Sequence, residues 1–93
     1  MPAARGKNSK KRVNFALSAP EASRVNLAGT FNDWDPEAKP LRLDKEGVWR
    51  TWLSLPPGEY EYLFVVDDQW CEDPACPEQT ENPYGSRNSV VRV

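Results

Sequence analysis

The sequence predicts an all-β domain that folds as an antiparallel β-sandwich. Short apolar runs alternate with turn-forming stretches along the chain, and no segment of ten or more residues repeats its apolar positions at the period of an amphipathic helix. Strands that bury one face must pack that face against another sheet, so this pattern is typical of two packed antiparallel sheets. The length of 93 residues accommodates one domain.

The first half of the chain contains three expected strands. Val13, Phe15 and Leu17 alternate with polar or small residues, which is the period of a half-buried strand. A second strand is expected at 25–29, where the apolar run ends in a glycine, and a short third strand at 41–43. Prolines and polar residues separate the three and indicate turns.

The clearest element is an expected β-hairpin formed by residues 48–55 and 60–66. The segment Pro56-Pro57-Gly58-Glu59 between them is typical of a tight turn. One face of each strand carries the larger apolar side chains, and we expect these faces to point inward: Trp49, Thr51, Leu53 and Leu55 on the first strand, and Tyr60, Tyr62, Phe64 and Val66 on the second. In this hairpin Trp52 lies opposite Leu63 on the outward face.

The rest of the chain is expected to be a long Pro-rich and acidic loop at 71–87, followed by a last strand at 89–93. Cys71 and Cys76 lie in that loop, where a disulfide is sterically conceivable but free thiols are the expected state in a reducing cytoplasm. Two thiols without any histidine do not complete a four-ligand zinc site by themselves. We expect neither a metal nor another cofactor.

Residues 1–11 are polar and basic, and we expect them to form a disordered tail in front of a module at 12–93. The first twelve residues carry five Lys or Arg and no acid, whereas the remainder has a net charge of −7. Such a tail can contact nucleic acid, but a solubilising leader is the simpler interpretation. No apolar stretch approaches the roughly 20 residues that span a bilayer, and no secretory signal is visible, so a cytoplasmic protein without membrane contact is expected.

Two tryptophans stand in polar turns directly after expected strands. Trp34 closes the turn that begins at Gly29, and Trp70 closes Asp67-Asp68-Gln69-Trp70. Indoles with few apolar neighbours in the sequence favour a flat aromatic surface for ligand stacking, and sugar rings present apolar C–H faces to such a surface. Alternatively, Trp34 packs as a lid over the end of the sandwich, and Trp70 is a strand-edge residue that packs beneath the loop at 71–82.

Two neighbours of Trp34 have simpler interpretations. We interpret Phe31 as a core residue. Asn32 is interpreted as a turn stabiliser rather than a ligand contact, because asparagine side chains commonly hydrogen-bond to nearby backbone in turns.

The acidic residues do not form a catalytic pattern. Asp67, Asp68, Glu72 and Asp73 lie close together in the sequence, but there is no histidine, nucleophile elbow or Gly-rich phosphate loop. Glycoside hydrolysis needs two carboxylates on either side of the scissile bond. We interpret these acids as turn formers and solvated charges, and expect a non-catalytic protein.

The order and spacing of these features resemble a known family. The stretches VNLAGTFNDWDPEAKPL and VWRTWLSLPPGEYEYLFVVDDQWCEDP, followed by Asn88-Ser89-Val90-Val91, are similar to family-48 carbohydrate-binding modules. That group includes the glycogen-binding domain of the AMP-activated kinase β subunit, the N-terminal modules of isoamylases and branching enzymes, and small stand-alone bacterial proteins, the type expected here. The resemblance covers residues 12–93 and implies an immunoglobulin-like, early-set sandwich that binds α-1,4-glucan.

The resemblance also implies roles for individual residues. Trp34 and Trp70 are at the positions of the two stacking tryptophans of the family, and Asn88 matches an asparagine that hydrogen-bonds sugar hydroxyls. Tyr84 falls where the kinase module has an aliphatic residue that enters the ligand ring. Ser86 falls where that module has a threonine, and the alignment of this loop needs a one-residue insertion.

Leu63 departs from the family pattern, because many members carry Lys or Arg there to reach a sugar hydroxyl. In the expected hairpin, Leu63 and Trp52 form an outward apolar patch, and such patches usually mark an interface. Three interpretations stay open. The patch extends the sugar platform with Trp52 as a third plate, forms a self-association or partner surface, or is covered by the loop at 71–87.

We therefore expect a non-catalytic module that binds α-1,4-glucan, such as glycogen, starch or malto-oligosaccharides, by stacking on exposed tryptophans. The candidate contacts are Trp34, Trp52, Leu63, Trp70, Tyr84, Ser86 and Asn88. The alternative is a protein-interaction or self-association module that uses the Trp52/Leu63 patch after loss of the sugar site. A glycogen-metabolising enzyme is a candidate partner, and nucleic-acid binding by the basic tail is a third, weaker class.

Overall fold

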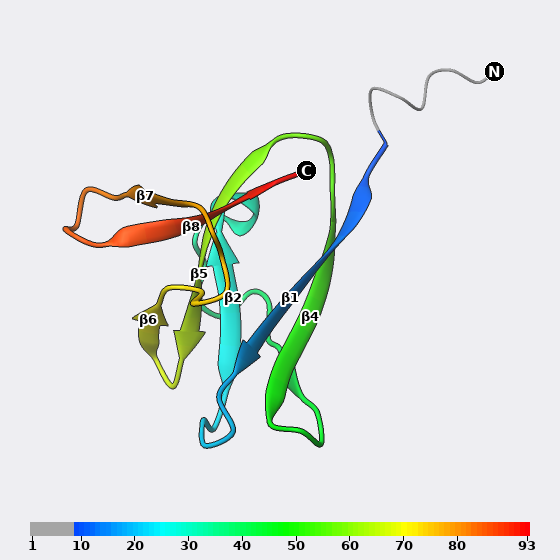
Figure 1. Ribbon diagram of the computed structural model, residues 1–93, viewed down its shortest axis with the longest axis vertical. Coiled ribbons are helices and arrows are strands. Elements are labelled where there is room, and N and C mark those ends of the chain that lie inside the picture. Colours follow the sequence, from blue (N-terminus) through cyan, green and yellow to red (C-terminus); the bar gives the residue numbers. More distant parts are fainter. Residues whose placement is uncertain (1–8) are drawn as a thin grey trace.

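Two antiparallel sheets pack face to face in the computed structural model, which describes residues 9–93 (Figure 1). The smaller sheet has the order β1-β4-β3 and consists of β1 (Lys11–Ser18), β4 (Val48–Leu55) and β3 (Arg42–Leu43). The larger sheet has the order β2-β5-β8-β7, with β6 also paired to β5. It consists of β2 (Val25–Gly29), β5 (Glu59–Val66), β6 (Gln69–Cys71), β7 (Gln79–Glu81) and β8 (Arg87–Arg92). The expected antiparallel β-sandwich is confirmed.

All the expected strands are present, with ends that move by one or two residues, but two short strands were not expected. β6 and β7 interrupt the segment 71–87, which the sequence predicts as loop. Each has three residues, which is too few to give a visible alternation. β1 begins at Lys11, one residue before the expected start of the module. Residues 1–8, most of the expected tail, lie outside the described residues.

The expected hairpin between residues 48–55 and 60–66 is wrong, because β4 and β5 belong to different sheets. β4 pairs with β1 and β3, whereas β5 pairs with β2, β6 and β8. Pro56 and Pro57 have no N–H to donate to a ladder, and Gly58 instead exchanges backbone hydrogen bonds with Val93. The segment after β4 therefore carries the chain from one sheet to the other.

The inward faces were nevertheless predicted correctly. The core combines side chains from both sheets, and its buried members are Phe15, Leu17, Val25, Leu27, Leu41, Trp49, Tyr62 and Phe64. Tyr62 packs edge-on against the rings of Phe15 and Phe64, with centroid distances of 5.0 and 5.9 Å. Phe31 packs against the same cluster, as expected.

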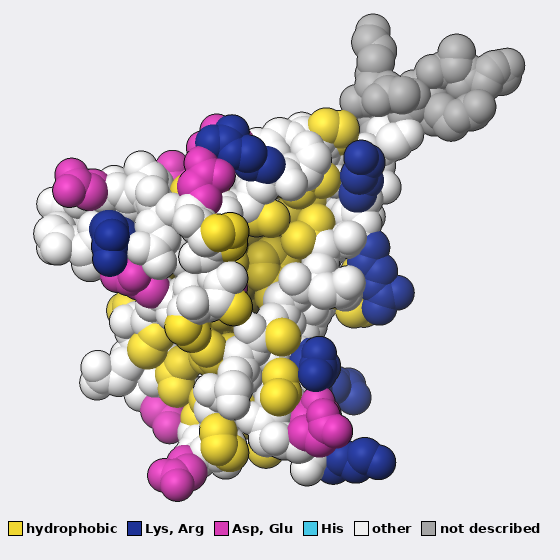
Figure 2. All heavy atoms as spheres, in the orientation of Figure 1, with side chains coloured by type: hydrophobic (Ala, Val, Ile, Leu, Met, Phe, Trp, Pro, Cys, Tyr) yellow, Lys and Arg dark blue, Asp and Glu magenta, His cyan; other side chains and the backbone are white. Residues whose placement is uncertain are grey.

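The surface reflects the two layers. In the view of Figure 2, apolar side chains lie in the opening between the sheets, and Lys and Arg side chains gather over the layer of β1 and β4. Both cysteines are free thiols, and Cys76 Sγ lies 3.1 Å from the carbonyl of Glu78. Within residues 9–93, no helix is long and apolar enough to cross a membrane.

A buried polar contact fixes the loop that follows β6 to the core. The Tyr62 hydroxyl donates to Asp73 Oδ2 at 2.6 Å, and the Asp73 N–H donates to Ser89 Oγ at 3.1 Å. Asp73 is 7% exposed. Burial, followed by the hydrogen bond to Asp73, raises the pKa of the Tyr62 phenol well above its ordinary value.

Tyr62→Phe is expected to destabilise the fold by about 1–3 kcal/mol, because it leaves one oxygen of a buried carboxylate without its donor. Urea unfolding measures the loss. Tyr60→Phe is the matched control, since the Tyr60 hydroxyl donates to the Pro56 carbonyl at an exposed site, and we expect it to cost less than about 1 kcal/mol. Equal costs for the two variants would contradict a special role for the Tyr62–Asp73 contact.

The raised pKa of Tyr62 also predicts how stability depends on pH. The phenol of the unfolded chain ionises at about pH 10, so the stability that Tyr62 contributes is complete below that pH and is lost above it. Between about pH 10 and 11.5 the free energy of unfolding should fall more steeply in the wild type than in Tyr62→Phe, by up to about 1.4 kcal/mol per pH unit. Parallel curves in urea titrations across this range would argue against it.

Candidate functional site

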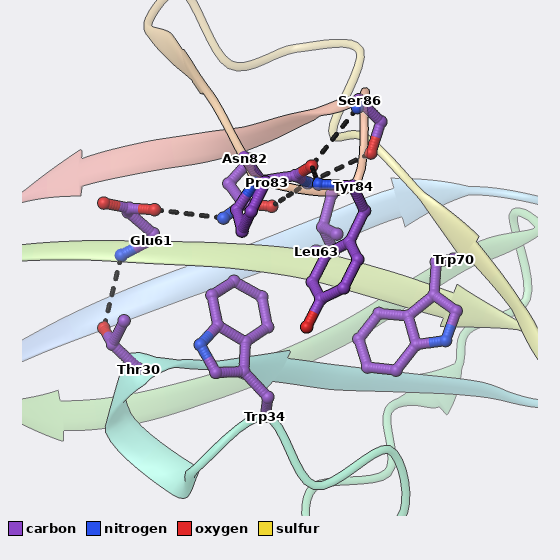
Figure 3. Close-up of a pocket in the computed structure, with 10 residues that line it drawn as sticks. Thr30, Trp34, Glu61, Leu63, Trp70, Asn82, Pro83, Tyr84 and Ser86 are labelled. Carbon is purple, nitrogen blue, oxygen red and sulfur yellow. Dashed lines mark hydrogen bonds between the residues drawn. The ribbon is translucent and has the colours of Figure 1, made fainter.

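A hollow of about 740 Å³ lies on the outward face of the larger sheet (Figure 3). Its floor is β5, and its walls come from the turn after β2, from β6 and from the tip of the β7–β8 hairpin. The lining residues are Thr30, Trp34, Glu61, Leu63, Trp70, Asn82, Pro83, Tyr84, Ser86 and Asn88.

The turn after β2 places Trp34 over the sheet. The side chain of Asn32 holds this turn, because its Oδ1 accepts from the Gly29 N–H and its Nδ2 donates to the Leu27 carbonyl, each at 3.0 Å. The expected turn-stabilising role of Asn32 is therefore confirmed. Gly29 is required for space, since a Cβ there would lie 2.5 Å from the Glu61 carbonyl oxygen. The Trp34 N–H closes the turn by donating to the Gly29 carbonyl at 2.9 Å.

A two-residue turn places Trp70 on the same face. Asp67 and Asp68 both have positive φ, at 48° and 70°, which is the geometry of a tight hairpin between β5 and β6. Asp67 Oδ1 accepts the backbone N–H groups of Ser23 and Arg24, both at 2.9 Å, and so ties this turn to the segment before β2. Trp70 pairs with Val65 and is 48% exposed, so it is not covered by the loop that follows it.

The two indoles form a tilted pair. Their ring centroids are 6.5 Å apart, and their planes make an angle of 49°. Leu63, which is 8% exposed, lies on β5 between the walls of the pocket and forms an apolar floor (Figure 3). Trp34 is half-buried, so each indole keeps part of its surface open to a ligand.

The tip of the β7–β8 hairpin forms the third wall. Asn82 Oδ1 accepts the N–H groups of Tyr84 and Ser86 at 2.9 and 3.2 Å, and Gly85 has a φ of 87° that favours glycine. Tyr84 is 90% exposed, and its ring extends from this tip toward the two tryptophans (Figure 3). The Tyr84 ring has little packing, so the turn is held by these hydrogen bonds.

Polar groups line one side of the pocket. Asn88 Nδ2 donates to Glu61 Oε1, and Asn88 Oδ1 accepts from Asn82 Nδ2, each at 3.0 Å. Asn82 Nδ2 also donates to Ser86 Oγ at 3.0 Å, and the Glu61 N–H donates to Thr30 Oγ1 at 3.3 Å.

Glu61 is the one carboxylate among the lining residues of the described chain, whereas glycoside hydrolysis needs two. Within residues 9–93, no group of three or more potential ligands could hold a metal ion.

Six of the seven candidate contacts from the sequence line this pocket, and Trp52 does not. Trp52 lies on β4, opposite Asn14 of β1, so it belongs to the other sheet and does not pair with Leu63. Its ring is 48% exposed, and the Arg12 guanidinium lies 4.4 Å from the ring centroid. The predicted Trp52/Leu63 patch is therefore wrong, and neither a third sugar plate nor a partner surface can be built from that pair.

Four lining residues were not predicted from the sequence: Thr30, Glu61, Asn82 and Pro83. For two of them, Glu61 and Asn82, the sequence contains a pattern that could have identified them. Glu61 alternates with Tyr62 and so shares the outward face of β5 with Leu63. Asn82 begins an Asn-Pro-Tyr-Gly stretch, which is a strong turn signal within the segment taken for an irregular loop.

Comparisons with known proteins agree with the fold and the expected family. A region of "Protein PTST homolog 2, chloroplastic" from Arabidopsis thaliana is 41% identical over 70 residues, which is 75% of this chain and 13% of that protein. The 1,4-alpha-glucan branching enzyme GlgB of Paraburkholderia xenovorans is 39% identical over 88 residues, or 87% of this chain and 12% of the enzyme. The AMP-activated protein kinase subunit beta-2 of Homo sapiens is 35% identical over 69 residues, which is 74% of this chain and 24% of that subunit. The chain thus spans less than a quarter of the length of these relatives.

The crystal structure of a maltogenic amylase from S. marinus contains a similar domain. It superimposes with a TM-score of 0.75 at 27% identity, and the match covers 95% of this chain and 14% of that one. The matching family consists of recognition modules, which are not catalytic in themselves, although some relatives that contain such a module are enzymes. Because its match extends over residues 13–93, the chain belongs to the family described as the glycogen recognition site of AMP-activated protein kinase, a family of carbohydrate-binding modules.

Proposed function

We propose that this chain binds α-1,4-linked glucan in the pocket on the larger sheet. Trp34, Trp70 and Tyr84 stack on glucosyl faces, Leu63 contacts the ligand from below, and Ser86 and Asn88 hydrogen-bond its hydroxyls. The α-1,4 linkage is supported by the family description and by the 1,4-alpha-glucan branching enzymes among the relatives.

The tilt between Trp34 and Trp70 carries this proposal. Successive residues of an α-1,4-glucan turn relative to one another, so the chain curves, whereas a β-1,4-glucan is a flat ribbon. Two ring planes at 49° over a 6.5 Å centroid distance can each stack on a different glucosyl residue of a curved chain. A flat ribbon that stacks on one of the two rings would meet the other obliquely, at 49°.

Leu63, in place of the basic residue of many family members, replaces a polar contact to the ligand by an apolar one and leaves the pocket in place. An apolar floor contributes burial of C–H surface, in place of a hydrogen bond from a basic side chain. The polar contacts then come from Ser86 and Asn88, on the side of the pocket that also carries Thr30, Glu61 and Asn82. Such a site holds one short stretch of glucan, and a polymer with many copies of that stretch raises the effective affinity.

The length of the relatives suggests how such a module works. In each relative the matched region is a minor part of a longer protein. We propose that this module likewise acts by keeping a partner, such as a glycogen-metabolising enzyme, close to the polymer.

Trp34→Ala and Trp70→Ala are each expected to weaken binding of maltoheptaose by about tenfold, because each removes a stacking face and its buried apolar area. Isothermal titration calorimetry measures the affinities, with β-cyclodextrin as a second α-glucan and cellohexaose as a flat control. We expect no saturable heat with cellohexaose.

Trp52→Ala is the matched control, because Trp52 is as exposed as Trp70 but lies on the other sheet. It should bind maltoheptaose like the wild type. Wild-type affinity in both pocket variants, with all proteins folded by circular dichroism, would refute the proposal. Equal losses in all three variants would refute the assignment to this pocket.

A further inference from the structure

We infer that Glu61 is a positioning residue for the glucan pocket, because its carboxylate sets the direction of a chain of side-chain amides that holds the Tyr84 turn. This inference rests on the proposed function. Glu61 lies on the outward face of β5 and lines the pocket. The amide chain runs from Glu61 through Asn88 and Asn82 to the tip of the β7–β8 hairpin.

The direction of this chain follows from what each group can donate or accept. An ionised carboxylate only accepts, so Glu61 Oε1 faces the NH₂ end of Asn88 at 3.0 Å. The carbonyl end of Asn88 therefore points away and accepts from the NH₂ of Asn82, also at 3.0 Å. Asn82 Oδ1 is then left to accept the N–H groups of Tyr84 and Ser86.

Reversal of either amide is unfavourable. A flipped Asn88 would place its carbonyl oxygen against the Glu61 carboxylate and its NH₂ against that of Asn82. A flipped Asn82 would turn its NH₂ toward two backbone N–H groups. Asn88 is 7% exposed, so water cannot readily repair such mismatches. The Glu61 carboxylate therefore fixes the chain at one end, and the two backbone N–H groups of the turn fix it at the other.

Hydrogen bonds rather than packing hold the Tyr84 turn: the Asn82 N–H donates to the Ser86 carbonyl at 2.9 Å, and the amide chain adds the two bonds to Asn82 Oδ1. Tyr84 is 90% exposed, and a Cβ added at Gly85 would meet nothing within 4 Å. An ordered turn lowers the conformational entropy that is lost when a glucan binds. Ser86 Oγ accepts from Asn82, which leaves the Ser86 O–H to donate toward a sugar hydroxyl.

The test compares Glu61→Gln with Glu59→Gln, which makes the same chemical change on the same strand. Glu59 is exposed, lies outside the pocket and forms a surface pair with Arg92, so its carboxylate contributes little. Maltoheptaose affinity is measured by calorimetry. Proton–nitrogen correlation spectra of the free proteins report the side-chain amides of Asn82 and Asn88.

A glutamine can donate as well as accept and carries no charge, so Glu61→Gln leaves the direction of the chain to the backbone N–H groups of Tyr84 and Ser86 alone. We expect the Kd for maltoheptaose to rise about threefold to tenfold relative to Glu59→Gln, while the urea midpoints of the two variants agree. The amide signals of Asn82 and Asn88 should shift or split in Glu61→Gln alone. Asn82→Asp keeps the acceptor for the turn but loses the donor toward Asn88, and should weaken binding similarly.

Two results would overturn the inference and leave the proposed function intact. The first is that Glu61→Gln binds maltoheptaose with the same affinity as Glu59→Gln, while Trp34→Ala still loses binding. The other is weaker binding with unmoved amide signals, which would mean that Glu61 contacts the sugar directly. If the wild-type protein binds no glucan, the proposed function fails, and the positioning role fails with it.

Discussion

The structure depends on β5, whose second half is apolar on both faces. Tyr62 and Phe64 point inward and fill the core, whereas Leu63 and Val65 point outward and are also buried. Every strand that pairs with β5 brings one wall of the pocket: β2 leads to the Trp34 turn, β6 carries Trp70, and β8 carries Asn88. The strand that organises the core therefore also forms the floor of the site, so core and pocket are built on one backbone.

The pocket divides its contacts between two kinds of surface. Trp34 and Trp70 form an aromatic side with their rings tilted at 49°, and Glu61, Asn82, Ser86 and Asn88 form a polar side. Asn88, which the family resemblance makes a sugar contact, is largely buried and already bonded at both ends of its amide. Its buried hydrogen bonds organise the polar side, and one amide hydrogen and one lone pair are left for a ligand.

The two sheets have different surfaces because the chain changes sheets after β4. Trp52 is as exposed as Trp70, yet it lies on the smaller sheet beneath the Arg12 guanidinium. A cation over an indole covers a ring face that a sugar would otherwise use. Trp52 and Trp70 are therefore equally exposed but lie in different environments, and the strand pairing decides which environment each ring occupies.

The sequence by itself determined the fold class, every strand except β6 and β7, the inward faces of β4 and β5, and six of the ten residues that line the pocket. Alternation has the same period whichever strand is the partner, so Trp49 and Tyr62 could be placed inward correctly. The tertiary structure alone decided the pairing, because two strands joined by a short Pro-rich segment can form a hairpin or lie in opposite sheets. It also decided that Glu61 and Asn82 meet at Asn88, since hydrogen bonds between residues far apart in sequence leave no local pattern.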